Sequence, residues 1–552
     1  MMNSAVVTVK QGILEGFADE KTGSLSWLGV PFAEPPVGEL RFRLPEPARA
    51  WEGVRAAKEF APCSLQRAKD GSVIGSEDCL YLNVWRPAGD DTNLPVFFFL
   101  HGGNNQTGSG ADLNGALFAQ KLGAVVVSPN MRLNGLGWLN LPALKTGDPA
   151  ADSGNLGLLD IKLALDWTRE NAATFGGNPD NITACGYSSG GRNLLCMLLS
   201  PLFAGAFART LTFSSGFTTT DPDYGMRTDA KALAPLFFED GLAASAEEAE
   251  EKLLSRDPAD CAKVKEWLCG LDGGRFGLLM AGAAIRMRVF PHLFADGFTL
   301  PAEGFGNISL GKYYHVPMLF LSGGNEFVFQ ANNDAHFKGK DLSDPANADL
   351  RKEYEFTARY GSALFGYTNA EHNAEEFFAD PGRPVIYTGR NLWGMNPEVT
   401  DKDAALFAGG SHGLDLYLLM NLERDDYAVN ENFWHVKNRA GRDALRECYF
   451  TYLRNYVMTG NPNDCGPSQE KDGCAGLPAW LPWESADCGH MMYFDADCSK
   501  AHVSCTEKLW REPEIFEEIR QDGTIPEERK QWILKNVLNA RFFSGRLDKE
   551  FA

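Results

Sequence analysis

The sequence lacks any run of about 18 consecutive apolar residues, which a membrane-spanning helix would need. Residues 1–10 also lack the apolar segment of a secretory signal peptide and instead have the pattern of a β-strand around Val6, Val7 and Val9. We therefore expect a protein without a membrane span that is cytoplasmic or, if a leader was removed, secreted or periplasmic. The sequence does not indicate an oligomeric state.

Positive charge is also scarce. The 552 residues include 52 Lys and Arg and 73 Asp and Glu, which gives a formal net charge of −21. A negative field of this size repels phosphate backbones, so nucleic-acid binding is not expected. Hydrophobic residues make up 44% and charged residues 23% of the chain. These proportions exclude wholesale disorder and provide enough apolar side chains for a large core.

The 12 cysteines are even in number, which is compatible with several disulfides but does not require them. Cys465 and Cys474 bracket a polar loop, where a disulfide would be reasonable. Cys185 and Cys196 have apolar neighbours and are expected to be core thiols. Because no cysteines have the spacing of a zinc ribbon, we expect no metal. No other cofactor is expected either.

Short apolar runs alternate with turn signals and helical patterns along the chain. Runs that are apolar throughout and end near glycine are typical of strands buried on both faces, and they lie at 95–100, 124–128, 182–185 and 316–321. Residues 158–171 have helical spacing between the second and third runs. This order predicts an α/β fold with a mostly parallel central sheet flanked by helices.

A weaker periodicity marks two regions, 225–300 and 330–400. We interpret them as helical and irregular insertions that cover a site in one domain, residues 1–552. The charged tail, about 511–552, has an amphipathic helical pattern. A packed carboxy-terminal helix explains it most simply, and an oligomer contact is the alternative.

A short glycine-flanked motif carries the strongest chemical signal. Gly186-Tyr187-Ser188-Ser189-Gly190 follows one strand pattern and precedes the apolar helix pattern at 194–199. That context is typical of a nucleophile elbow, in which glycines permit a sharp turn and the serine stands at the start of a helix. The alternative interpretation is a plain tight turn.

A second glycine motif, His101-Gly102-Gly103-Asn104, follows the run at 95–100. Consecutive glycines let backbone amides point into one small space, where they could stabilise an oxyanion together with the amide of Ser189. A flexible glycine turn is the alternative. His101 itself is expected to be structural.

A nucleophilic serine needs a base, and the base needs an acid that orients it. Among nine histidines, His412 lies in the glycine-rich loop 409–413, ahead of an apolar run. Glu326 follows the strand pattern at 316–321, and Asp415 is the runner-up for the acid. The order Ser188, Glu326, His412 is the order of an α/β-hydrolase.

At this point the chain resembles the type-B carboxylesterase/cholinesterase family of α/β-hydrolases, from about residue 5 to about residue 510. The motifs that carry the resemblance are those at 29–38, 40–42, 76–84, 155–160 and 175–179. The resemblance implies that Ser188 is the nucleophile, Glu326 the acid and His412 the base. It also implies oxyanion amides, contributed by Gly103, Asn104 and Ser189.

The same resemblance implies three supporting features. Cys63 and Cys79 would form a disulfide, Arg41 and Glu77 would form a buried ion pair, and Ser215 would support the triad acid.

The chain departs from the family pattern at Tyr187, where glutamate is usual, at Asn104, where a third glycine is frequent, and at Ser189, which replaces alanine. The loop between the two cysteines contains no tryptophan to face a choline headgroup, which argues against cholinesterase activity. We expect hydrolysis of a small-molecule carboxylic ester through an acyl-enzyme. The alternatives are a non-catalytic adhesion or binding protein, or an amidase or thioesterase on the same fold.

Overall fold

The computed structural model describes residues 5–275, 291–421, 433–464, 476–484, 489–539 and 546–551. The chain divides into two compact units. Unit 1 comprises Met1–Ala208, Thr218–Ile285 and Val289–His315, and unit 2 comprises Arg209–Phe217, Arg286–Arg288 and Val316–Ala552. The single domain expected from the sequence stays a prediction, and each unit is described by itself.

The sheet of unit 1 is built around β9 (Leu94–Leu100). It pairs in parallel with β10 (Val125–Pro129) and with β11 (Gly177–Tyr187). Beyond β10 the sheet continues with antiparallel β8 (Tyr81–Pro87), β4 (Ser24–Pro31) and β3 (Phe17–Asp19). The runs predicted at 95–100, 124–128 and 182–185 are therefore strands, and their residues are buried as the uniform apolar pattern indicated.

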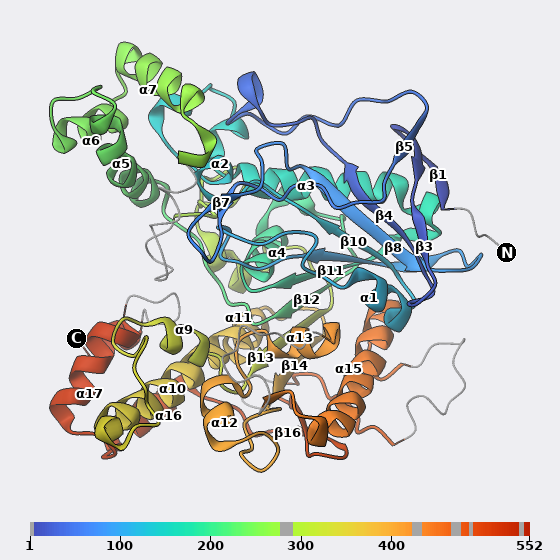
Figure 1. Ribbon diagram of the computed structural model, residues 1–552, viewed down its shortest axis with the longest axis vertical. Helices are drawn as coiled ribbons and strands as arrows, with labels where there is room; N and C mark the ends of the chain where they lie inside the picture. Colours follow the sequence, from blue (N-terminus) through green and yellow to red (C-terminus); the bar gives the residue numbers. More distant parts are fainter. Residues whose placement is uncertain are drawn as a thin grey trace. The chain divides into compact units, whose positions relative to one another are not determined.

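Helices cover these strands (Figure 1). Helix α1 (Gly115–Leu122) packs on β8 and β10, while α3 (Leu156–Asn171) and α4 (Ser189–Leu199) pack on β11. The helix predicted at 158–171 is confirmed as α3. The smaller elements of this unit are β1 (Val6–Val9), β2 (Gly12–Glu15), β5 (Val54–Ala56), β6 (Gln66–Arg67), β7 (Val73–Ile74) and α2 (Asn134–Gly137).

The first predicted insertion is helical where it is described. It contains α5 (Pro222–Glu239), α6 (Ala246–Leu254) and α7 (Pro258–Gly270). Each helix begins after a side chain that accepts from a first-turn amide, namely Asp221, Ser245 and Asp257. Proline follows the cap at α5 and α7, where its missing N–H costs nothing.

Unit 2 has its own run of parallel strands. They are β12 (Arg209–Phe213), β13 (Met318–Gly323), β14 (Ile386–Asn391) and β15 (Met491–Ala496), followed by antiparallel β16 (Ala501–Thr506). The chain thus has the predicted α/β fold, with a mixed, mostly parallel sheet and flanking helices. The interpretation of 330–400 as helical and irregular is wrong at β14, whose polar Thr388, Arg390 and Asn391 hid a strand that is buried throughout.

The remaining elements of unit 2 are mainly helices. They are α9 (Val328–Asn333), α10 (Ala348–Asn369), α11 (Glu371–Phe378), α12 (Lys402–Ala408), α13 (Leu414–Met420), α15 (Arg439–Thr459), α16 (Glu512–Gln521), α17 (Glu527–Ile533), a π-helical turn (Leu534–Leu538) and α18 (Leu547–Glu550). The predicted tail is therefore helical. Its apolar side chains, among them Ile519, Ile533 and Leu538, join the core around α10, so it packs as a carboxy-terminal element of unit 2.

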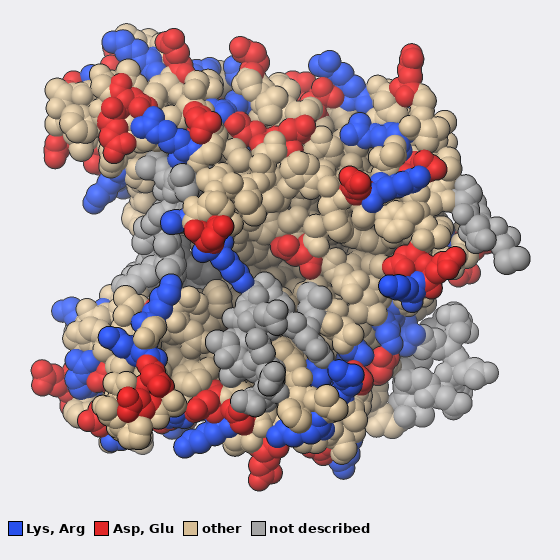
Figure 2. Space-filling model, viewed as in Figure 1, with Lys and Arg blue, Asp and Glu red and all other residues tan. Residues whose placement is uncertain are grey.

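Within the residues that the structure describes, no helix is long and apolar enough to cross a membrane. On the face shown in Figure 2, acidic and basic side chains are interspersed despite the net charge of −21.

Candidate functional site

Ser188 stands on a sharp turn between β11 and α4. Its backbone has φ of +52° and ψ of −118°, a strained conformation for a residue with a side chain. The turn lies against the end of β9, because a Cβ added at Gly190 would be 2.2 Å from the carbonyl oxygen of Leu100. Only glycine allows this approach, so the predicted strand–turn–helix context of a nucleophile elbow is present.

The loop after β9 packs directly on this turn. A Cβ added at Gly102 would lie 3.2 Å from Cβ of Ser188 and 2.7 Å from Cδ1 of Tyr187. The next residue, Gly103, has φ of +101°, and its carbonyl accepts from the amide of Thr107 at 2.9 Å. The two glycines therefore bring the loop against the serine, with the ring of Tyr187 beside Gly102.

His101, at the start of the loop, is buried. Its Nδ1 lies 2.8 Å from the carbonyl oxygen of Gly102. Burial lowers the pKa of His101, which favours the neutral imidazole. These contacts fit the structural role expected of this histidine.

Helix α4 holds the same loop through two consecutive residues. The Arg192 Nη2 donates to Oδ1 of Asn104 at 2.8 Å. The side-chain amides of Asn193 and Asn105 donate to one another, at 2.9 Å in each direction. Asn104 and Asn105 both have positive φ, of +59° and +55°, so side-chain bonds fix two left-handed residues in a row.

Ser189, the first residue of α4, is completely buried. Its hydroxyl has no hydrogen-bond partner among the described residues. A hydroxyl in this state loses its hydration without compensation.

In unit 2, a carboxylate and an imidazole form the second group of predicted residues. Glu326 lies three residues beyond the end of β13, and His412 lies in the loop before α13. The His412 Nδ1 is 2.6 Å from Oε2 of Glu326, and both side chains are buried. Because a carboxylate only accepts, Nδ1 carries the proton and Nε2 is left as the basic nitrogen.

The second oxygen of Glu326 is also occupied. Its Oε1 accepts from the amide of Gly323 at 2.5 Å and from the hydroxyl of Ser214 at 2.6 Å. The carboxylate is thus held on both oxygens, and its direction toward His412 is fixed. The imidazole is flanked by the rings of Phe365 and Phe329, which stack with it at centroid distances of 5.3 and 6.1 Å.

Ser214 is the residue of this group that sequence reasoning missed. The resemblance pointed to Ser215, but the hydroxyl that donates to Oε1 of Glu326 is that of Ser214, while the Ser215 hydroxyl donates to the carbonyl of Phe213 at 3.0 Å. The chain turns at Ser214, with φ of +53°, directly after β12 ends. A one-residue difference at a turn is not visible in the string Ser214-Ser215-Gly216.

Asp415, the runner-up for the acid, does not take the place of Glu326 on the imidazole. Its Oδ1 accepts from the amide of Leu416 at 2.9 Å, and its Oδ2 has no hydrogen-bond partner among the described residues. Burial, reinforced by the negative charge of Glu326, raises the pKa of Asp415 to about 7. The buried carboxyl of Asp415 therefore lies in the electrostatic field of Glu326.

The expected ion pair between Arg41 and Glu77 is present, and it is partly rather than fully buried. The Arg41 Nε donates to Oε2 of Glu77 at 2.7 Å, and Nη2 donates to Oε1, so the pair is bidentate. Arg41 also donates to the carbonyls of Leu268 and Leu271, at 3.0 and 2.6 Å, and so connects the end of α7 to the pair.

The expected disulfide between Cys63 and Cys79 is not formed in the structure, where both are free thiols. Cys79 is completely buried beside Ser64, and Cys63 lies beside Gln66, so the two sulfurs face different neighbours. Burial raises the pKa of both thiols. Cys185 and Cys196 are buried thiols, as expected. Cys465 and Cys474 lie outside the described residues.

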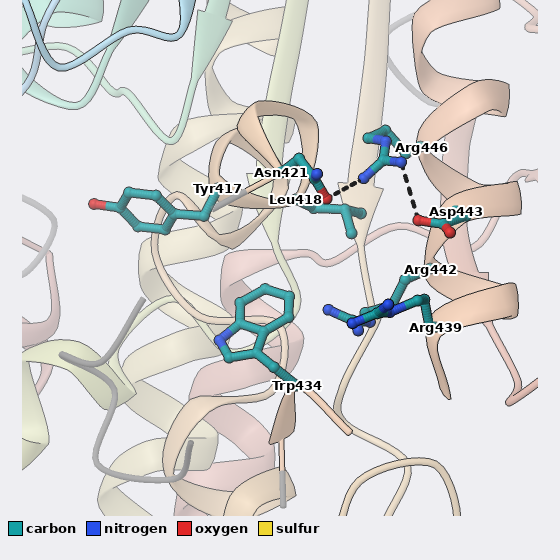
Figure 3. A pocket seen from close by; sticks show the side chains of 8 residues that line it. All are labelled: Tyr417, Leu418, Asn421, Trp434, Arg439, Arg442, Asp443 and Arg446. Carbon is teal, nitrogen blue, oxygen red and sulfur yellow. Dashed lines mark hydrogen bonds and ion pairs between the residues drawn. The ribbon is translucent and has the colours of Figure 1, made fainter. Parts of the chain in front are cut away.

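A separate cavity of about 250 Å³ lies in unit 2, beside the start of α15 (Figure 3). Its lining includes Trp434 and three arginines, of which Arg446 bonds Asn421 and Asp443. None of the predicted catalytic residues lines this cavity.

In the described part of the chain, no three His, Cys, Asp or Glu side chains are grouped as metal ligands would be.

The predicted residues thus form two groups. Unit 1 brings Ser188, Tyr187 and Ser189 together with the loop of Gly103 and Asn104. Unit 2 brings Glu326, His412 and Ser214 together.

Comparison with known proteins finds the carboxylesterase family and individual esterases. Residues 3–236 match the model of the carboxylesterase family. Fumonisin B1 esterase of Sphingopyxis macrogoltabida is 44% identical over 198 residues, which are 35% of this chain and 36% of that protein. Para-nitrobenzyl esterase of Bacillus subtilis is 36% identical over 348 residues, which are 61% of this chain and 66% of that protein. The matches thus span about one third and just under two thirds of these relatives.

Among solved structures, the carboxylesterase of Geobacillus stearothermophilus is similar with a TM-score of 0.68 and 26% identity. The similarity covers 91% of this chain and 98% of that one.

Proposed function

Because the chain belongs to the type-B carboxylesterase family, we propose that it is a serine hydrolase of carboxylic esters. Ser188 is the nucleophile, His412 the general base, and Glu326 the acid that orients the base. The backbone amides of Gly103, Asn104 and Ser189 are the donors to the oxyanion. The observation that carries the proposal is the strained backbone of Ser188, on a glycine-flanked turn between strand and helix.

The geometry of unit 2 supports the roles of the acid and the base. With Nδ1 of His412 donating to Glu326, Nε2 is the ring nitrogen that can accept a proton. Glu326 would also stabilise the imidazolium that forms, and its two other hydrogen bonds keep its direction fixed.

In the first half-reaction, Oγ of Ser188 attacks the ester carbonyl carbon while Nε2 of His412 takes the hydroxyl proton. The carbonyl π electrons move to oxygen, where the three amides stabilise the negative charge. When the carbon–oxygen double bond re-forms, the bond to the alcohol breaks and His412 returns the proton to the leaving oxygen. The products are a free alcohol and an acyl group on Ser188.

In the second half-reaction, water attacks the acyl carbon and gives its proton to Nε2 of His412. The second tetrahedral intermediate breaks the bond to Oγ of Ser188, which recovers the proton. A carboxylic acid leaves, and the residues return to their starting state. No group outside the chain, the ester and water is needed for this balance.

Two of the relatives are named as esterases, fumonisin B1 esterase and para-nitrobenzyl esterase. These names support ester hydrolysis over amide or thioester cleavage. They leave the natural substrate of this chain undefined.

The test combines a covalent probe with an assay. A fluorophosphonate should phosphonylate one residue, and mass spectrometry of the digest should place the adduct on the peptide containing Ser188. Hydrolysis of p-nitrophenyl acetate should stop in proportion to labelling, and Ser188→Ala should show neither labelling nor hydrolysis while keeping the circular dichroism of the folded protein. An adduct on another serine, or full hydrolysis by Ser188→Ala, would contradict the proposal.

A further inference from the structure

Arg192 lies one helical turn beyond Ser188, and its amide donates to the Ser188 carbonyl at 3.0 Å in the first turn of α4. Its side chain is almost completely buried, with 1% of its surface exposed. Burial lowers the pKa of the guanidinium to about 9, so it still carries its charge at neutral pH. Removing a charged guanidinium from water costs free energy unless hydrogen bonds compensate for it.

The contact of Arg192 with the loop provides such a hydrogen bond. Its Nη2 donates to Oδ1 of Asn104 at 2.8 Å, a charge-assisted hydrogen bond. On its other side, Nδ2 of Asn104 donates to Oε1 of Gln106 at 3.1 Å. The amide side chain of Asn104 is therefore held at both ends.

Asn104 has a backbone φ of +59°, a region that glycine enters freely and other residues enter at a cost. The direction of its N–H, and of the peptide that joins it to Gly103, depends on this conformation. A side chain tied to α4 fixes the backbone where a glycine would leave it free. The neighbouring bonds between Asn105 and Asn193 attach the loop to the same helix a second time.

We propose that Arg192 is a positioning residue that holds the loop amides of Gly103 and Asn104 in the direction needed to bind the oxyanion. This inference rests on the proposed function, because it assigns a task to the same amides. Arg192 acts through Asn104 and need not touch the substrate. Preorganised donors contribute to the rate because they need not reorient as the charge develops.

The test is a double-mutant cycle between Arg192→Met and Asn104→Gly, measured as kcat and KM for p-nitrophenyl acetate. Arg192→Met should lower kcat by roughly 10- to 100-fold and change KM much less, since a misplaced catalytic group costs about this much. Arg192→Met should also weaken inhibition by an aryl trifluoromethyl ketone, which forms a tetrahedral adduct, by a similar factor. In the Asn104→Gly background, Arg192→Met should lower kcat less than about three-fold, because the tether is already absent.

Two controls separate positioning from general stability. Arg209→Met removes another largely buried arginine, which lies in β12 and donates from Nη1 to the carbonyl of Val457. This variant should lower the melting temperature without lowering kcat. Arg192→Lys keeps the charge but loses the planar fork, and should recover only part of kcat. If Arg192→Met does not fold, Asn104→Ala tests the same contact from its other end and should lower kcat by a similar factor.

The outcomes are distinguishable from failure of the proposed function. If the fluorophosphonate adduct forms elsewhere than Ser188 in the wild type, the proposed function fails. If Ser188 is labelled but Arg192→Met keeps the wild-type kcat, or loses the same factor in both backgrounds, the positioning role is overturned and the proposed function stands.

Discussion

The hydroxyl of Ser214 donates to Oε1 of Glu326 across 2.6 Å, while the other oxygen of the same carboxylate receives Nδ1 of His412. The two bonds lie on opposite oxygens, so the serine sets the direction in which Glu326 meets the imidazole.

Ser214→Ala should lower kcat/KM by about ten-fold, because a hydrogen bond to a charged group is worth about 1.5 kcal/mol or more. Steady-state hydrolysis of p-nitrophenyl acetate measures the loss. Ser215→Ala, which removes the hydroxyl next along the chain, should have the smaller effect. A larger loss for Ser215→Ala would contradict the assignment of Ser214.

Glu326→Gln should lower kcat far more than Ser214→Ala, by about 10³-fold or more, because an amide can no longer stabilise the imidazolium or impose its tautomer. Pre-steady-state release of p-nitrophenol measures the acylation step directly. Asp415→Asn is the matched control for removing a nearby buried carboxyl, and it should retain most of the acylation rate. The reverse order of the two variants would identify Asp415 as the acid.

Asp415 should make the protein less stable as the pH rises from about 4 to about 7. Its pKa in the folded protein, about 7, lies above the ordinary value near 3.9, so the folded state holds its proton over this range while the unfolded state has lost it. The loss amounts to at most about 4 kcal/mol. Urea unfolding at a series of pH values should show the slope in the wild type and a flatter profile in Asp415→Asn. Parallel profiles would show that the carboxyl is ionised throughout.

Ser189→Ala should stabilise the protein by about 1 kcal/mol, since it removes a buried hydroxyl without a hydrogen-bond partner among the described residues. The proposed contribution of Ser189 to the oxyanion is its backbone amide, so kcat should be retained. Thermal unfolding and the ester assay on the same preparation measure both quantities. Ser309→Ala, at an exposed serine, should leave the stability unchanged. A destabilised or inactive Ser189→Ala would show that the hydroxyl has a role of its own.

Arg41→Met should destabilise the protein by about 3 kcal/mol, because it leaves the carboxylate of Glu77, whose side chain is only 15% exposed, without its partner. Lys10→Met breaks the exposed pair with Glu170 and should cost about 1 kcal/mol or less. Urea denaturation of the two variants measures the difference. Equal losses would mean that the Arg41–Glu77 pair is no better shielded from water than the surface pair.

The buried parallel strands were predictable because a strand covered on both faces is apolar at nearly every position. The runs that became β9, β10 and β13 follow this rule, with Ser128 as the one polar residue in them. The rule fails for β14, where Arg390 is buried and its Nη2 bonds Glu371 at 2.6 Å. The partner that makes this burial possible is 19 residues away and on another element, so no local pattern reveals it.

The sequence by itself determined the α/β order of strands and helices, the glycine-flanked Ser188 and the candidacy of Glu326 and His412, because these features depend on local composition and spacing. Tertiary structure alone decided which serine meets Glu326, that Cys63 and Cys79 remain thiols, and that Arg192 reaches Asn104. Each of those results depends on where a side chain points after a turn, and on which distant atom it then meets. Direction in space is set by packing over the whole unit, and residue order does not encode it locally.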